Sequence, residues 1–424
     1  MRRERAQKRK KALPTFLTLR AALLFFHDFS DLFRQAPFSL LFCSFSGLLA
    51  GVGLSLMTDL LQLLPGLMIL IPPAIAMRGN IYSAFVSRLG TSMHLGLFSP
   101  SLKKGGVLYQ NAYVSLLLTL VLSVVLGVLA RVVAGAFGVP SISVCGFILV
   151  SVIAGLISGC NLLGVAILVS VVGYRRGWDL DNVSSPIITS AGDVITIPSL
   201  FLAAVLLRGT PAGFVTASSI LFLLAAVFCA VKGVWWSNDA TVRRVLAESI
   251  PMLFVCSLLS TLAGLTLDSR LPSLIAVPAV LVLVPPFLGE SNALGGILSA
   301  RLSSMLHIGT IRPKPFPEKV VSANFAVIYL FSVFIFSLVG VLSYFASHLT
   351  AAQNAGAPGL FELLLVSLLG GLLCTTFLNL AAYYIAVLSF RFGLDPDNDT
   401  IPLITSLTDA VGVLCLLFAM LVIL

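Results

Sequence analysis

The residues best suited to chemistry are two aspartates, Asp193 and Asp409. Each is the last residue of a short segment that places polar side chains in otherwise apolar sequence. Their segments, "SPIITSAGD" and "IPLITSLTD", align at a shift of 216 positions. Thr189 and Thr405 precede the aspartates by four positions, so each pair shares one helical face. If these apolar segments cross a bilayer, each aspartate lies about two helical turns inside it. A carboxylate there costs about 3 kcal/mol, so we expect it to face water, a cation or a partner.

A second pair of segments carries further oxygen ligands. "PPAIAMRGNIYSAFVSRLGTSMHLG", residues 72–96, aligns with "PPFLGESNALGGILSARLSSMLHIG", residues 285–309, at a shift of 213 positions. Asn80 lies in the first segment, and Glu290 and Asn292 lie in the second. Because both pairs of segments occur in the same order with nearly the same shift, we interpret the chain as an internal duplication.

The glycines before these asparagines predict a break in each membrane-spanning helix. We expect one helix to be interrupted around Gly79–Asn80 and the other around Gly289–Asn292. Unwound backbone is tolerated at membrane depth only where it is buried in protein or lines a cavity. The breaks would therefore lie beside a pathway for a polar solute.

The paired aspartates favour a hard cation. If the duplicated halves are related by a two-fold axis, their equivalent carboxylates face that axis and form a site made of oxygen ligands. Neither "SPIITSAGD" nor "IPLITSLTD" contains a histidine or cysteine, so we expect none to accompany the two carboxylates, which disfavours zinc and copper. Mg²⁺ fits because it keeps several water molecules and needs only one or two carboxylates. The alternative for each aspartate is a structural ion pair with Arg88 or Arg301.

The composition excludes a soluble globular protein. The 424 residues are 58% hydrophobic and only 10% charged, and long apolar runs recur along the chain. Continuous apolar runs also argue against a β-barrel, whose strands alternate. We predict an all-α polytopic membrane protein of two parallel five-helix repeats joined by a linking transmembrane helix. The eleven predicted spans lie near 36–58, 65–97, 107–130, 141–172, 184–207, 214–234, 246–267, 273–309, 320–347, 358–390 and 401–424.

The lysines and arginines set the expected orientation. With the N-terminus inside, cytoplasmic loops carry eleven of them and external loops carry three, which is a strong positive-inside bias. We therefore expect a cell-membrane protein with a cytoplasmic N-terminus and an external C-terminus. Because each repeat has an odd number of spans, five, a direct fusion would insert the second repeat upside down in the membrane. The unmatched span near 214–234 adds one more crossing and keeps the two repeats parallel.

Three arginines, Arg78, Arg88 and Arg301, remain within the predicted spans. Arg88 and Arg301 lie toward the span ends, where a long cationic side chain can snorkel. Arg78 could pair with Glu290 across the axis or repel cations from an empty site. It could also neutralise an organic or anionic solute, and a transporter of such a solute is the main alternative function.

An intramembrane aspartyl protease, which also needs two facing aspartates, is a weaker alternative. "SAGD" partly matches the Gly-x-Gly-Asp motif of such proteases, but no tyrosine precedes Asp409 and the Pro-Ala-Leu motif is absent. A protease pair also needs carboxylates in unlike environments, whereas the surroundings here are duplicated. We predict that the protein is not an enzyme.

Both pairs of segments together resemble the MgtE superfamily of magnesium channels and transporters. Solute carrier family 41, in which the MgtE-type membrane domain is duplicated, is the closer match. The resemblance covers nearly all of residues 32–424 and rests on "MRGN", "SRLGTSMHLG", "ARLSSMLHIG", "SPIITSAGD" and "IPLITSLTD". It implies that Asp193 and Asp409 bind magnesium on the two-fold axis, with Thr189 and Thr405 one turn earlier.

The chain departs from the family pattern in two ways. "GESN" replaces the usual Gly-Gly-Asn in the second half, which adds Glu290 and moves Asn292 one position out of register with Asn80. The chain also has no loop long enough to hold the cytosolic sensor and gate domains of bacterial MgtE. Gating by cytosolic magnesium would therefore need another mechanism.

These observations predict transport of divalent cations, with Mg²⁺ as the transported ion, through a carboxylate-lined site on the pseudo-two-fold axis. The expected metal ligands are Asp193, Asp409, Thr189, Thr405, Asn80, Asn292 and Glu290. We expect a basic cytoplasmic tail and interfacial helix over 1–31, a first repeat over 32–209, a linking helix over 210–243 and a second repeat over 244–424. We expect the cation and membrane lipid as partners, no organic cofactor, no nucleic acid and a functional monomer.

Overall fold

The structure, a computed structural model, describes residues 29–94, 96–176, 180–237, 239–349, 358–391 and 396–424. It divides into two units, residues 1–41 and 42–424, and each unit is described by itself. In the first unit, the described part is the beginning of helix α2 (Ser30–Ser55). The predicted basic tail and interfacial helix lie almost entirely outside the described residues.

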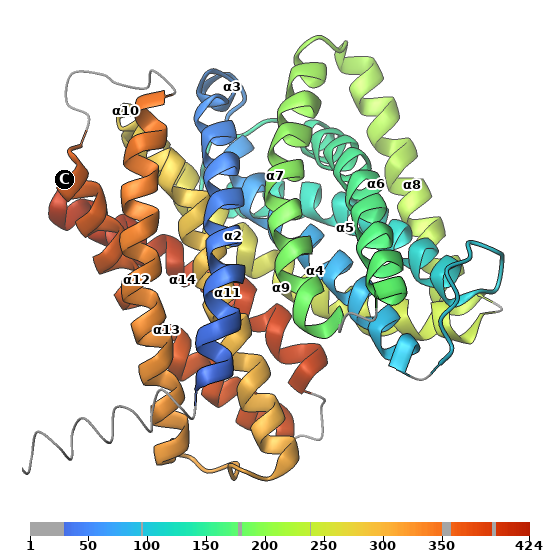
Figure 1. The fold of residues 1–424 in the computed structure, drawn as a ribbon. Helices are drawn as coiled ribbons and strands as arrows, with labels where there is room; N and C mark the ends of the chain where they lie inside the picture. The colour runs from blue at the N-terminus through green and yellow to red at the C-terminus, as the bar shows by residue number, and fades with distance from the viewer. Residues whose placement is uncertain (1–28, 95, 177–179, 238, 350–357, 392–395) are drawn as a thin grey trace, which may run out of the picture. The chain divides into compact units, whose positions relative to one another are not determined.

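All regular elements among the described residues are helices (Figure 1). After α2 they are α3 (Thr58–Leu63), α4 (Leu67–His94), α5 (Val107–Ala136), α6 (Val144–Arg176), α7 (Leu180–Arg208), α8 (Ala212–Trp235), α9 (Ala240–Ser269), α10 (Leu271–Ala276), α11 (Pro278–Ile308), α12 (Lys319–Leu349), α13 (Leu360–Arg391) and α14 (Pro396–Ile423). Within the described ranges, eleven of these helices are long and apolar enough to cross a membrane. The predicted all-α polytopic fold is confirmed.

The predicted breaks in two of these helices are wrong. Both α4 and α11 continue through the Gly-Asn region without unwinding. The glycines serve close packing instead. A Cβ atom at Gly79 would lie 3.2 Å from the Thr189 methyl group, and one at Gly289 would lie 3.4 Å from the Asp193 carboxylate. A missing side chain permits a close approach of helices as readily as it permits a break.

The element order repeats along the chain. The long helices α4 to α7 recur as α11 to α14, and the short helix α3 recurs as α10 at the same shift of 213 positions. Within the first half, α4 packs on α5, α6 and α7, and within the second half, α11 packs on α12, α13 and α14. We call two residues equivalent when they are related by a shift of 213 positions, or of 216 positions in α6, α7, α13 and α14.

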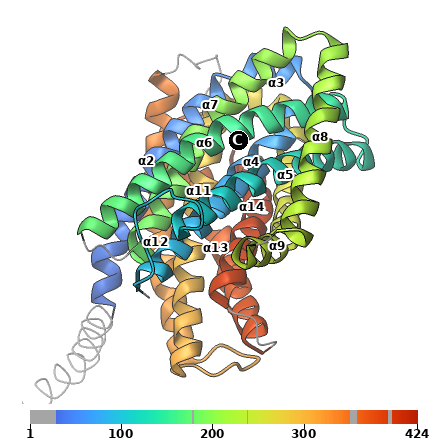
Figure 2. The same cartoon turned by 90° about the vertical axis from the view of Figure 1, so that its right-hand side faces the viewer.

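The first long helix of each half packs on the other half. Helix α9 packs on α4 and α5 as well as on α14 of its own half (Figure 2). A Cβ atom at Gly264 of α9 would overlap the carbonyl oxygen of Ile69 in α4. At the equivalent place, a Cβ atom at Gly51 of α2 would overlap the carbonyl oxygen of Val282 in α11. The two halves therefore exchange their first helices through matching backbone contacts.

Helix α8 has no equivalent among the described residues of the other half. It packs on α5, α6 and α9, and the side chains on its remaining faces are exposed and apolar, with Phe214, Leu221, Leu224 and Phe228 among them. In a membrane these faces would contact lipid, which suits a helix that links two repeats. The exact limits of the repeats and of the linking segment stay a prediction.

Candidate cation site

Two buried aspartates from equivalent helices form the centre of the site. Asp193 of α7 is 8% exposed and Asp409 of α14 is 4% exposed. The two carboxylates lie close enough to interact electrostatically. Helix α7 reaches this position by packing on α4, and α14 does so by packing on α11. The duplicated segments thus bring their aspartates within electrostatic range of each other.

The Asp409 carboxylate accepts two hydrogen bonds. The Ser260 hydroxyl of α9 donates to Oδ2 over 3.0 Å, and the Asn292 amide of α11 donates to Oδ1 over 2.7 Å. Asn292 is one of the predicted ligands, and it reaches the site through its amide nitrogen. Its own carbonyl oxygen, Oδ1, is buried without a hydrogen-bond partner.

The Asp193 carboxylate has different surroundings. It lies against Gly289 of α11, and Glu290 and the Cys43 thiol are close enough to sense its charge. Cys43 in turn contacts the Ser190 hydroxyl. The expectation that no cysteine accompanies the aspartates is therefore wrong, because α2 brings one in from outside the two aligned pairs of segments.

Glu290 is a third buried carboxylate in this region. Its side chain is fully buried, and the Ser44 hydroxyl of α2 donates a 2.5 Å hydrogen bond to Oε1. Its second oxygen, Oε2, has no hydrogen-bond partner among the described residues. The equivalent position in α4 is Met77. The third carboxylate therefore occurs in only one half of the site.

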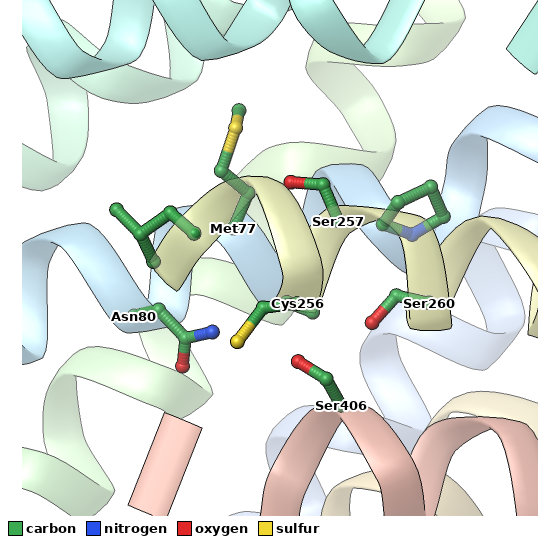
Figure 3. A pocket seen from close by; sticks show the side chains of 9 residues that line it. Met77, Asn80, Cys256, Ser257, Ser260 and Ser406 are labelled. Carbon is green, nitrogen blue, oxygen red and sulfur yellow. The ribbon is translucent and has the colours of Figure 1, made fainter. Parts of the chain in front are cut away.

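The other predicted ligands lie at the edge of the site. Asn80 lines a narrow pocket between α4, α9 and α14, into which Cys256, Ser260 and Ser406 also point (Figure 3). The Thr405 hydroxyl donates to the Pro402 carbonyl over 3.0 Å, so it is bound within its own helix. Thr189 directs its methyl group toward Gly79. These three residues surround the aspartates rather than forming the centre of the site.

Helices α2 and α9 contribute to the site in a way that the two pairs of segments did not predict. Ser44 and Ser260 donate to the carboxylates from these two helices. A third duplicated segment was present in the sequence, because "LLFCSFSGLLAG" (40–51) matches "LFVCSLLSTLAG" (253–264) at Leu40, Cys43, Ser44, Leu49, Ala50 and Gly51. This segment is short and apolar, so its match gave a weak signal.

Arg78 does not take part in the site. The side chain is fully buried. Its guanidinium donates to the Ser158 and Ser123 hydroxyls over 3.0 and 3.2 Å, and to the carbonyls of Ala74 and Ser151. The possible pair of Arg78 with Glu290 is therefore wrong. Arg78 also cannot neutralise an anionic solute at this site, because its side chain points into α5 and α6. The alternative function, transport of such a solute, therefore loses the residue on which it rested.

Arg88 and Arg301 bind asparagines rather than the aspartates. The Arg88 Nε donates to Asn111 over 2.7 Å, and the equivalent Arg301 Nε donates to Asn324 over 2.8 Å. The alternative in which the aspartates form structural ion pairs with these arginines is wrong. The carboxylates thus remain without a cationic partner among the described side chains.

The donor set suits a cation that keeps part of its water. Across the described residues, no group of three or more His, Cys, Asp and Glu side chains is arranged to hold a metal ion. Two or three carboxylates, hydroxyl groups and an amide oxygen can instead bind a hydrated dication through a few direct contacts.

Comparisons with known proteins agree with this chemistry. The family model described as MgtE, divalent cation transporter, matches residues 71–203 and again residues 284–419. Solute carrier family 41 member 2 of Mus musculus is 27% identical over 81% of this chain, and its Homo sapiens counterpart is 26% identical over the same share. The chain spans 62% of the length of both relatives.

Solute carrier family 41 member 3 of Mus musculus is 27% identical over 86% of this chain and is covered over 78% of its own length. No solved structure gives a significant match. The two matches to the family model together cover more than half of the chain and include both aspartates. The chain therefore belongs to the MgtE family of divalent cation transporters, a family of transporters and not of enzymes.

Proposed function

We propose that this protein carries divalent cations, with Mg²⁺ as its main substrate, across a membrane. The observation that carries the proposal is the pair of buried aspartates, Asp193 and Asp409, which come from equivalent helices and have no cationic partner among the described side chains. Isolated buried carboxylates are costly, and a bound cation removes much of that cost. Membership of a divalent cation transporter family supports the same function.

The chemistry of the ligands favours Mg²⁺ over softer metals. The groups around the aspartates are carboxylates, hydroxyls and amides, which are hard oxygen ligands. The thiols of Cys43, Cys256 and Cys374 are the exceptions, and a neutral thiol is a weak ligand compared with a thiolate. A transition metal that prefers nitrogen and sulfur ligands therefore gains little here.

Hydration is the main obstacle to such transport. A membrane potential of 100 mV supplies about 4.6 kcal/mol for two charges moving inward. The larger cost is to take a strongly hydrated dication into a medium of low dielectric constant. We infer that the carboxylates offset this cost on the axis between the repeats, while the ion keeps most of its water.

Flux through proteoliposomes tests the function. We expect purified protein to admit Mg²⁺ to vesicles that contain a magnesium-sensitive dye. The variant Asp193→Asn/Asp409→Asn keeps the shape of both side chains and should abolish the flux. Parallel vesicles offered an organic anion test the alternative substrate. Wild-type flux in the double variant, or transport of the anion alone, would contradict the proposal.

We also propose a cytoplasmic N-terminus, an external C-terminus and a functional monomer in the cell membrane. The charge bias of the loops supports the orientation. The pairing of equivalent aspartates within one chain supports the monomer. A tag after Leu424 should react with an impermeant reagent on intact cells, and native mass spectrometry should find active protein as single chains. A tag accessible only after permeabilisation would reverse the orientation.

A further inference from the structure

The two aspartates occupy equivalent positions but have unequal capacity for a cation. Both oxygens of Asp409 already accept hydrogen bonds, from Ser260 and Asn292. No described side chain donates a hydrogen bond to Asp193. A carboxylate that lacks donors gains more from a cation than one whose oxygens are already paired. The duplicated segments alone do not predict this difference.

Glu290 adds a second underused carboxylate on the Asp193 side. It is fully buried and interacts electrostatically with Asp193. One of its oxygens is held by Ser44, and the other has no hydrogen-bond partner among the described residues. Two buried carboxylates thus lie near each other with oxygen atoms available to a cation.

The equivalent region of the other half carries no such charge. Its pocket is lined by Met77 where Glu290 would stand, and by Cys256 and Ser257 where Cys43 and Ser44 would stand. Figure 3 shows Met77 pointing away from the groups that converge beside Ser406. The two halves therefore share their hydroxyl and thiol groups and differ by one carboxylate.

We propose that the transported dication first binds off the axis, between Asp193 and Glu290, with Ser44 and Ser190 supplying hydroxyl oxygens, before it reaches the axis. Asp409 is a positioning residue in this state, held away from the ion by Ser260 and Asn292. The inference rests on the proposed function and names the part of the site that binds first. Two carboxylates balance the charge of one dication, whereas a monovalent cation would leave one carboxylate charge without a counter-ion.

Magnesium binding to the purified full chain in detergent tests the asymmetry. We measure the melting temperature across a Mg²⁺ titration, with Na⁺ at matched ionic strength as the control. Glu290→Gln and Asp193→Asn should each weaken apparent Mg²⁺ affinity by about tenfold or more, because each removes one of two adjacent charges. Asp409→Asn should weaken it by less than about threefold. Melting temperatures without Mg²⁺ show whether each variant is folded.

A swap of the two equivalent residues gives a test that does not depend on loss alone. The variant Met77→Glu/Glu290→Met moves the third carboxylate to the other half, where Ser257 occupies the place of Ser44. In this background, Asp409→Asn should become the more damaging of the two aspartate substitutions. Such a reversal cannot come from general damage to the fold.

The outcomes separate the inference from the proposed function. If the wild type transports Mg²⁺ but Glu290→Gln binds it with unchanged affinity, the off-axis site is wrong and the proposed function stands. Equal losses in Asp193→Asn and Asp409→Asn would likewise return the ion to the axis. Stabilisation by Na⁺ as strong as that by Mg²⁺ would overturn the assignment of a dication. Absence of both Mg²⁺ binding and flux in the wild type would overturn the two proposals together.

Discussion

The two halves of the molecule share an arginine–asparagine contact but differ in the side chains that fill their interiors. In both halves, an arginine Nε donates to an asparagine whose amide donates to the carbonyl four residues earlier. The pairs are Arg88 with Asn111 and Arg301 with Asn324. Deeper in each half, the side chains at three equivalent positions differ in charge, in size or in chemical type.

The first half holds a buried arginine in this interior position. Arg78 is bound by Ser123 and Ser158, and Gly155 leaves room for the guanidinium. Replacing Gly155 by a residue with a Cβ atom would bring that atom into contact with Ser123 and within 2.5 Å of an Arg78 nitrogen. This half thus fills its interior with a cation and hydroxyl groups.

The second half fills the same space with aromatic rings. The residues equivalent to Arg78, Ser123 and Ser158 are Ser291, Phe336 and Cys374. Phe336 packs on Phe287 with ring centroids 5.0 Å apart, and Gly371 leaves room for its ring as Gly155 does for the arginine. The backbone arrangement therefore tolerates either chemistry, provided that the volume is filled.

The largest expected effect comes from breaking the symmetry of the aspartates. The duplicated segments alone predict equal losses for Asp193→Asn and Asp409→Asn. The unequal contacts lead us to expect a fall in Mg²⁺ flux of about a hundredfold for Asp193→Asn and of about tenfold for Asp409→Asn. The double variant should add little, because the residues act on one ion. Initial flux rates in proteoliposomes with matched protein content decide between the two patterns.

The next effect concerns the buried arginine. Arg78→Ser installs the equivalent residue of the second half but leaves a cavity, so we expect a loss of about 3 kcal/mol in the free energy of unfolding. Adding Ser123→Phe supplies the ring that fills this space in the second half. The double variant should recover about half of the loss. Unfolding in mixed detergent micelles measures both quantities.

Ser123→Phe in the wild-type background is the control for that pair. With Arg78 present, the ring has no space, and we expect a loss of about 2 kcal/mol from overpacking. A double variant less stable than Arg78→Ser would contradict the view that the two interiors are interchangeable. If Arg78→Ser leaves the free energy of unfolding unchanged, the hydrogen bonds of the guanidinium only offset the cost of burying its charge.

Much of this fold could be predicted from the sequence because its signals are local. An apolar run of sufficient length and the loop charges beside it define a span without knowledge of its neighbours. The four-residue spacing of Thr189 and Asp193 likewise fixes their shared helical face. The spans of the described residues begin and end within seven residues of the predicted positions.

The features that could not be predicted depend on which helix lies opposite. Gly79 was expected to break α4, yet it serves as a contact for Thr189, and the sequence does not separate these two uses of glycine. A pair with Glu290 was one possibility for Arg78, yet hydroxyls from α5 and α6 satisfy it. The exchange of α2 and α9 between halves decides which serines reach the carboxylates, and no local pattern encodes it.

A moderate effect is expected where the exchanged helices touch. Gly51→Ala and Gly264→Ala would each drive a methyl group into a carbonyl oxygen of the opposite helix. Backbone atoms cannot rotate away, so we expect each variant to lose about 2 kcal/mol of stability. Gly296→Ala is the control, because no atom lies within 4 Å of the place that its Cβ atom would take and alanine favours a helix. Unequal losses at the two contacts would show that the exchange is one-sided.

The smallest effect tests whether the retained contacts are truly equivalent. Asn111→Ala and Asn324→Ala each remove one hydrogen bond to an arginine, and polar contacts between membrane helices contribute about 0.6 kcal/mol on average. Both asparagines are buried, at 4% and 2% exposure, and their arginine bonds differ by only 0.1 Å in length. We therefore expect equal losses of about 1 kcal/mol in the same unfolding measurement, with little change in Mg²⁺ affinity. A loss of stability at one position only would mean that two hydrogen bonds of equal length contribute unequal free energies. Contacts alone would then not suffice to compare Asp193 with Asp409, and Mg²⁺ binding data would be needed.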